Sequence, residues 1–129
     1  MLYCFQATLR CIVVVRGAAL MEEGQLLRGI LEGCVLAVIA EGETYGYEIL
    51  ARLEKNGFEA LLEGTLYPVL TRLEKKGHIS CRREKSPYGP VRKYYSVTKD
   101  GISALEDFKA NYKKITASAD EVLMGEQEQ

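Results

Sequence analysis

The 129-residue sequence predicts a mainly helical fold with one small β-hairpin and a long C-terminal helix. In four segments apolar residues recur at about every third or fourth position, a spacing typical of amphipathic helices. Between the third and fourth segments the spacing changes, and two short β-prone runs flank a turn rich in proline and glycine. A chain of this length and composition is expected to bury one hydrophobic core.

Residues 1–20 are apolar and differ from the rest of the chain. Arg10 and Arg16 interrupt the apolar run and no Lys or Arg precedes it, which argues against a signal peptide. No charge-free stretch approaches the roughly 20 residues that a membrane span requires. We expect translation to begin at Met21, so that residues 1–20 are an extension of doubtful status. If they are translated, Ile12–Val15 is expected to form an extra strand or a flap.

Two helices are expected in the segment that follows. Apolar pairs repeat every four residues over 26–39 and predict a helix over about 23–40. Thr44 is expected to cap a second helix, because a hydroxyl at this position can accept a hydrogen bond from the first turn. Asn56-Gly57 is expected to end that helix, because both residue types tolerate a left-handed backbone.

A third helix and a hairpin are expected next. The helix should begin near Glu63-Gly64 and end at Gly77, with the inward stripe Leu66, Val69, Leu70 and Leu73. Residues 79–85 and 92–98 are short and β-prone, and the turn signal Ser-Pro-Tyr-Gly-Pro lies between them. This pattern predicts a two-stranded hairpin.

The last segment predicts a dimerisation helix over about 99–124, capped by Thr98 and followed by a tail, residues 125–129. Its apolar positions are spaced by three and four residues, which is the heptad pattern of a coiled coil, although Ala119 is a weak member. The expected dimer interface consists of Leu105, Phe108, Tyr112, Ile115 and Val122.

The net charge of −1 hides a strong asymmetry along the chain. Residues 65–99 contain nine Lys or Arg and two acidic residues, a balance of +7, so the remaining residues together carry −8. A basic surface within an acidic frame can bind a polyanion through one face. A solvated, charge-rich surface is the alternative interpretation of this pattern.

Three helices followed by a hairpin form the element order of a winged helix-turn-helix domain, here predicted over residues 21–98. In that arrangement the third helix enters the major groove of DNA and the hairpin contacts the adjacent backbone. The predicted DNA-binding residues of the third helix are Thr65, Tyr67, Pro68, Thr71, Arg72 and Lys75. Those of the wing are Arg82, Arg83, Lys85, Arg92 and Lys93.

The residue types suggest separate roles. Arg72 can donate two hydrogen bonds to a guanine edge, whereas Lys75 suits a phosphate. Five cations on two paired strands repel one another, and a phosphate backbone would relieve that repulsion. The alternative for the helix is an ordinary solvent-exposed face.

Four stretches of the chain resemble the PadR-like family of bacterial transcriptional regulators. They are Gln25-Leu26-Leu27-Arg28-Gly29, Tyr45-Gly46-Tyr47-Glu48-Ile49, the third helix from Glu63 to Gly77, and the segment from Gly89 to Gly101. The single short C-terminal helix is similar to that of the compact branch of the family. Gly33 departs from the pattern, because a larger apolar residue is usual at this position.

The resemblance implies a cytoplasmic homodimer that represses transcription by binding a near-palindromic operator. It also implies release from DNA by a small ligand or another signal, and the sequence does not identify that effector. Phe108 and Tyr112 are available to an aromatic ligand between subunits, but their place in the heptad pattern favours plain dimer packing.

Enzymatic, metal and cofactor functions are not expected. His78 is the single histidine, it has no recognisable nucleophile partner nearby, and no phosphate-binding glycine loop is present. The four cysteines lack the close pairing of a zinc site, and Cys34 and Cys81 fit buried packing better than chemistry, although Cys81 as a thiol sensor stays open. The main alternative function is a winged-helix module that binds another protein and not DNA.

Overall fold

The computed structural model describes residues 24–59 and 61–125. The chain divides into two compact units, Met1–Leu31 and Glu32–Gln129. Of the first unit, residues 24–31 are described, and they are helical. The predicted extension over residues 1–20 lies outside the described residues, so the expectation about it stays a prediction.

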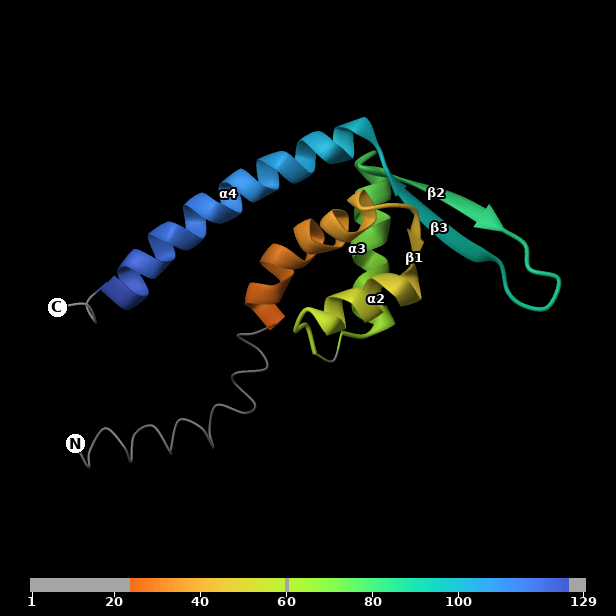
Figure 1. The fold of residues 1–129 in the computed structure, drawn as a ribbon, viewed down its shortest axis with the longest axis horizontal. Coiled ribbons are helices and arrows are strands. Elements are labelled where there is room, and N and C mark those ends of the chain that lie inside the picture. The colour runs from red at the N-terminus through yellow and green to blue at the C-terminus, as the bar shows by residue number, and fades with distance from the viewer. Residues whose placement is uncertain (1–23, 60, 126–129) are drawn as a thin grey trace, which may run out of the picture. The chain divides into compact units, whose positions relative to one another are not determined.

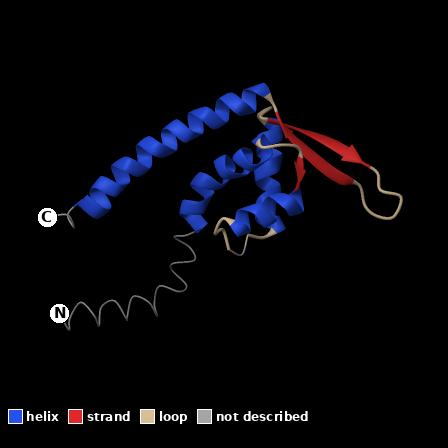
Figure 2. Ribbon diagram, in the orientation of Figure 1, coloured by secondary structure: helices blue, strands red, loops and turns tan. Residues whose placement is uncertain are grey.

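The second unit begins within the same helix, which runs over residues 24–40. The elements that follow are β1 (Thr44–Tyr45), α2 (Gly46–Lys55), α3 (Glu63–Lys75), β2 (Ile79–Glu84), β3 (Arg92–Val97) and α4 (Lys99–Met124). Helices dominate, and the strands form one small sheet (Figures 1 and 2). The mainly helical fold with a hairpin is therefore confirmed, and α3, β2, β3 and α4 end within two residues of the predicted limits.

The sheet contains a strand that the sequence did not predict. It is antiparallel and three-stranded, in the order β1-β3-β2, with Thr44 opposite Tyr95 and Tyr45 opposite Tyr94. The prediction that Thr44 caps α2 is wrong, because the N-cap is Tyr45 and makes no side-chain cap. Thr44 is instead buried in β1, and its hydroxyl donates a 2.8 Å hydrogen bond to Glu48.

The core of the second unit forms where the apolar faces of the helices meet the sheet. The predicted inward stripe of α3, from Leu66 to Leu73, is buried. It is joined by side chains from the helix over residues 24–40, from α2, and from both long strands: Val35, Leu36, Ile39, Ile49, Leu53, Ile79 and Tyr95. Burying these side chains supplies the main driving force for folding and orients the opposite face of α3 toward solvent.

The junction between α3, β2 and α4 is held by a glycine and a threonine. Gly77 has a φ of 77°, and the amide of His78 donates to the carbonyl of Leu73 at 2.9 Å, which closes the end of α3. The Thr98 hydroxyl accepts from the amide of Gly101 at 3.0 Å and donates to the Gly77 carbonyl at 2.6 Å. The predicted cap of the last helix is therefore confirmed, and it also fixes α4 to the end of α3.

Helix α4 buries two residues near its beginning, Gly101 and Leu105, and is largely exposed beyond them. Leu105 is only 5 % exposed within its own chain, so it packs in the core and leaves little surface for a second copy, and its place in the dimer interface stays a prediction. The ring of Phe108 lies directly over Gly33, where it occupies the space that a Cβ would need, and stacks on Tyr112 with centroids 6.2 Å apart. Beyond this point Tyr112, Ile115 and Val122 are exposed.

Candidate nucleic-acid interface

The exposed side of α3 carries the predicted recognition residues. All six of them are exposed: Thr65, Tyr67, Pro68, Thr71, Arg72 and Lys75. Pro68 stands inside the helix near its beginning, and the Thr71 hydroxyl donates to the Tyr67 carbonyl at 2.9 Å, which holds that side chain against the helix. Pro68, Thr71, Arg72 and Lys75 fall on the face that the helical spacing places opposite the buried stripe, and Thr65 and Tyr67 are exposed beside it.

Arg72 lies near an acid that the sequence did not connect to it. Lys76 donates to both carboxylate oxygens of Glu32, at 3.1 and 3.3 Å. The Nε atom of Arg72 is 3.9 Å from the same carboxylate, and its side chain remains 54 % exposed. Since Lys76 makes the shorter contacts, the Arg72 guanidinium keeps donors free for a base edge. Base reading by Arg72 stays a prediction.

The wing, defined here as residues 79–97, has two chemically different faces. Arg83 lies opposite Lys93 in the ladder, and Arg82 lies opposite Tyr94. Because side chains alternate along a strand, Arg83 and Lys93 share one face with buried Tyr95, which we call the inner face. Arg82 and Tyr94 lie on the other, outer face. The five predicted wing cations are therefore not one cluster.

The inner face turns toward α3. Burial raises the pKa of Tyr95 to about 12, and smaller contributions come from Cys81 and then from Tyr67 of α3. Arg83 and Lys93 are both exposed beyond Tyr95, and within the described part of the chain neither forms an ion pair. Like charges placed directly opposite each other are destabilising, so this pair is suited to an external anion.

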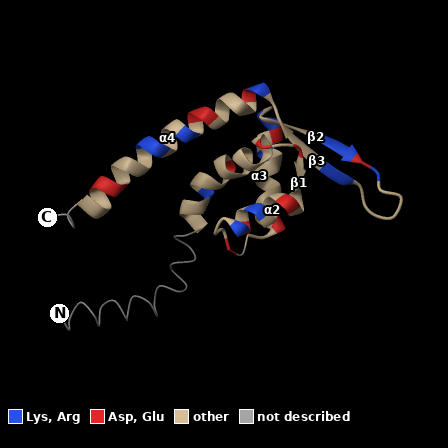
Figure 3. Ribbon diagram, viewed as in Figure 1, with Lys and Arg blue, Asp and Glu red and all other residues tan. Residues whose placement is uncertain are grey.

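On the outer face, Arg82 forms ion pairs with acidic side chains. The Arg82 guanidinium contacts Glu43 at 2.8 Å and Glu84 at 3.1 Å. Glu84 also lies opposite Arg92 in the ladder. The sequence placed Arg82 among the DNA contacts, but its geometry favours binding within the protein. Figure 3 shows Lys and Arg on both wing strands, with acidic residues close to them.

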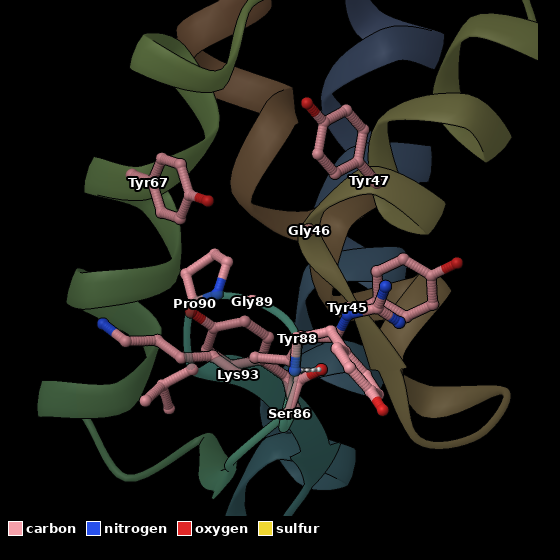
Figure 4. A pocket seen from close by; sticks show the side chains of 12 residues that line it. Tyr45, Gly46, Tyr47, Tyr67, Ser86, Tyr88, Gly89, Pro90 and Lys93 are labelled. Atoms are coloured by element: carbon pink, nitrogen blue, oxygen red, sulfur yellow. Dashed lines mark hydrogen bonds between the residues drawn. The ribbon is translucent and has the colours of Figure 1, made fainter.

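A hollow of about 920 Å³ lies between the wing and the beginnings of α2 and α3. Its walls are rich in tyrosine, and they include Tyr45, Tyr47, Tyr67, Tyr88, Pro90 and Lys93. Figure 4 shows Tyr67 on α3 and Tyr47 on α2 at opposite sides, with Tyr88, Pro90 and Lys93 of the wing below them. In the turn between β2 and β3, the Tyr88 amide donates a hydrogen bond to the Ser86 hydroxyl at 3.4 Å.

The hydroxyl of Tyr47 is set up as a hydrogen-bond donor. Glu63, at the start of α3, raises the pKa of Tyr47, first through its charge and then through a hydrogen bond between the side chains. The phenol of Tyr47 is therefore directed toward the Glu63 carboxylate. The other exposed tyrosines of the hollow, Tyr45, Tyr67 and Tyr88, lie with Lys93 in a surface of donors and positive charge, which is the chemistry that contacts a phosphodiester backbone.

Three parts of this site were missed by sequence reasoning. They are strand β1 with Tyr45, the tyrosines Tyr47 and Tyr88 at the hollow, and the acids that hold Arg82 and Lys76. The alternation of residues along β2 and β3 does carry a signal, because it separates Arg83 from Arg82 once the register is known. The remaining partners come from distant parts of the chain and carry no local signal.

Other chemistries find little support in the described residues. Cys34 and Cys81 are free and half-buried, and burial raises the pKa of each thiol, which disfavours the reactive thiolate. Within residues 24–59 and 61–125, no three His, Cys, Asp or Glu side chains are grouped to hold a metal ion. None of the helices that the structure describes is long and apolar enough to cross a membrane.

Comparison with known proteins agrees with this geometry. Solved structures similar to this chain include a PadR-like transcriptional regulator from Bacillus cereus, 40 % identical, with a TM-score of 0.67, over 78 % of this chain and 97 % of that one. A PadR family regulator from Eggerthella lenta is 26 % identical, with a TM-score of 0.77, over 87 % and 97 % of the two chains.

A third similar structure is that of Bacillus subtilis PadR in complex with operator DNA. It is 26 % identical, with a TM-score of 0.56, over 61 % of this chain and 46 % of that one. The model of the PadR-like family matches residues 35–107, more than half of the chain. The family and these relatives are transcriptional regulators, not enzymes. The chain belongs to the PadR-like family of transcriptional regulators.

Proposed function

We propose that this protein is a sequence-specific DNA-binding repressor that acts in the cytoplasm as a homodimer on a near-palindromic operator. The observation that carries the proposal is the free positive charge of the inner wing face beside the exposed side of α3. Arg83 and Lys93 supply cations without acidic partners among the described residues, and tyrosine hydroxyls line the hollow between wing and helix.

The division of labour follows from these positions. Helix α3 presents Thr65, Arg72 and Lys75 to the major groove, where Arg72 can recognise guanine. The inner wing face and Lys85 contact the phosphate backbone, which fixes the register of α3 on the duplex. The relative in Bacillus subtilis, whose structure contains operator DNA, supports the same use of this fold.

Dimerisation is proposed through the exposed part of α4. Tyr112, Ile115 and Val122 are 47 %, 65 % and 78 % exposed, and their spacing places them along one seam. Two copies of α4 packed along this seam would remove the apolar side chains from water. A two-fold axis between two recognition helices explains why a near-palindromic operator is expected.

Response to a small ligand is proposed on the family resemblance. The Phe108–Tyr112 stack lies at the beginning of the proposed seam, with the rings inclined by 18°. The contact of Phe108 with Gly33 of the same chain supports a packing role for this aromatic pair.

The competing function is a winged helix that binds protein and not DNA. Fluorescence anisotropy with the DNA upstream of the protein's own gene, beside a scrambled duplex, separates the two functions across a salt series. The proposal expects preferential binding to the upstream fragment and a log–log salt slope of about −0.9 for each neutralised phosphate. Binding to neither duplex under low salt would contradict the proposal and favour the protein-binding module.

A further inference from the structure

We propose that Arg82 is a positioning residue, which together with Glu43 clamps the wing to the strand β1, and does not itself contact DNA. The inference rests on the proposed function, because the clamp matters through the orientation it gives to the DNA-binding wing. It reassigns one of the five wing cations that the sequence placed at the DNA.

Each of the three guanidinium nitrogens of Arg82 already donates one hydrogen bond within the protein. Its Nη2 atom donates to Glu43 Oε1 at 2.8 Å and its Nε atom to Glu43 Oε2 at 3.4 Å, a two-pronged contact. Its Nη1 atom donates to Glu84 Oε2 at 3.1 Å. A paired guanidinium of this kind is geometrically fixed, whereas a single exposed ion pair is weak.

The local charge argues against a phosphate contact. Arg82 contributes one positive charge, and Glu43 and Glu84 contribute two negative charges within the contacts above. Hydrogen bonding to Arg82 lowers the pKa of Glu43, so the carboxylate is charged at neutral pH. With Arg92, which lies opposite Glu84 in the ladder, the two cations and two carboxylates of the outer face carry no net charge, so this face does not attract a phosphate. Arg83 and Lys93 on the inner face lack such neutralisation among the described side chains.

The contacts of Arg82 join all parts of the sheet. Glu43 immediately precedes β1, Arg82 belongs to β2, and the Ser96 hydroxyl of β3 donates to Glu43 at 3.3 Å. The guanidinium also lies over the Tyr94 ring, 4.8 Å from its centroid, and Tyr94 packs edge-on against Tyr45 at 5.9 Å. Arginine, two tyrosines, serine and glutamate therefore form one continuous layer on the outer face.

The layer lies beyond the residues that hold the base of the wing. Buried Ile79 and Tyr95 anchor the two long strands in the core, and only two residues of β1 pair with β3, so the outer layer is what supports the sheet at Arg82 and Tyr94. Tyr45 belongs to β1 and also lines the hollow between the wing and the helices. Loss of the clamp would make the orientation of the wing and of Tyr45 less fixed. Arg83 and Lys93 of the inner face would still be present to contact phosphates.

The two possible roles of Arg82 predict opposite effects for Glu43→Ala. If Glu43 holds a clamp, its removal weakens DNA binding, by about threefold to tenfold for a few side chains that must be ordered again. If Arg82 binds phosphate and Glu43 only competes for it, its removal strengthens binding. Glu54→Ala on α2 is the matched control, because it removes an exposed acid that makes no ion pair among the described residues.

We would measure the full-length protein and its Glu43→Ala, Arg82→Ala and Arg82→Lys variants by anisotropy on operator and scrambled duplexes over a salt series. The clamp predicts weaker operator binding for all three, a reduced operator preference and an unchanged salt slope. Lysine should not rescue, because an ammonium group cannot hold two carboxylates in a fork and stack on Tyr94. A phosphate contact predicts rescue by lysine and a slope smaller by about 0.9 for Arg82→Ala.

Hydrogen exchange in the free protein tests the clamp without DNA. The amides of Tyr45 and Tyr94 should exchange faster in Glu43→Ala and Arg82→Ala than in Glu54→Ala. Tighter DNA binding by Glu43→Ala than by Glu54→Ala, or unchanged exchange and affinity, would overturn the inference. If the unmodified protein bound neither duplex, the proposed function would fail, and the exchange rates alone would still decide whether the clamp exists.

Discussion

The contact between Gly33 and Phe108 predicts an unusual cost for a glycine-to-alanine change in a helix. An added Cβ at Gly33 would overlap the Cδ1, Cε1 and Cζ atoms of the Phe108 ring. The ring can leave this position only by giving up its stacking on Tyr112 or by moving α4. Overpacking of this kind costs about 1–3 kcal/mol. The higher helix propensity of alanine offsets about 1 kcal/mol of this cost.

Gly33→Ala is therefore expected to lower the free energy of unfolding by roughly 0–2 kcal/mol. The control is Gly64→Ala in the first turn of α3, where an added Cβ meets no atom within 4 Å. It should raise the free energy of unfolding by about 0.5–1 kcal/mol. The free energies of unfolding of the two variants should thus differ by about 0.5–3 kcal/mol, with Gly64→Ala the more stable.

Urea unfolding followed by circular dichroism at fixed protein concentration measures this difference. In the double variant Gly33→Ala, Phe108→Ala the overpacking cost should disappear, because the methyl group at position 33 then occupies space that the Phe108 ring has vacated. A coupling energy of about 1 kcal/mol or more between the two sites is expected. The reasoning would be refuted if Gly33→Ala stabilised the protein as much as Gly64→Ala does.

Three further predictions concern DNA binding, assembly and pH. Arg83→Ala and Lys93→Ala should each flatten the salt slope of DNA binding by about 0.9 and weaken binding to every duplex by the same factor. Arg72→Ala should instead weaken binding to the operator in particular, by about 1–3 kcal/mol. Equal losses of affinity on every sequence for all three variants would contradict these separate roles. Tyr112→Glu places charge in the proposed seam and should give monomers in sedimentation analysis, so a dimer of normal stability would count against the coiled-coil arrangement. The pKa of Glu43 is lowered in the folded protein from its ordinary value of 4.5, so the clamp stabilises the protein above the unfolded pKa and this stabilisation is lost as the pH falls through the lower folded pKa. A carbon-detected NMR titration of the Glu43 carboxyl with a midpoint at or above 4.5 would contradict this.

Local signals predicted much of the fold. The stripe of α3 and the left-handed glycine at Gly77 specify where that helix lies and where it ends. The cap at Thr98 was predicted from a single residue type, because the hydrogen bond it makes is confined to the first turn of α4. These features depend on neighbours within a few positions, so the sequence alone is sufficient to recognise them.

Features that depend on distant partners could not be predicted in the same way. Strand β1 has two residues, too few for any periodicity, and it exists because Thr44 and Tyr45 pair with β3 about fifty positions later. The partner of Arg82 lies 39 residues away at Glu43. Leu105 shares its spacing with the exposed seam, and a heptad pattern does not tell the core of one chain from the interface between two.

The most direct test of the central claim is to map, by NMR, which backbone amides shift when the isotope-labelled protein is titrated with the upstream duplex. DNA held between α3 and the inner wing face predicts the largest shifts in the first half of α3, at Arg83 and Lys93, and around Tyr47 at the hollow. The exposed end of α4 should change little. Shifts confined to α4, or to the outer wing face around Arg82, would contradict the account.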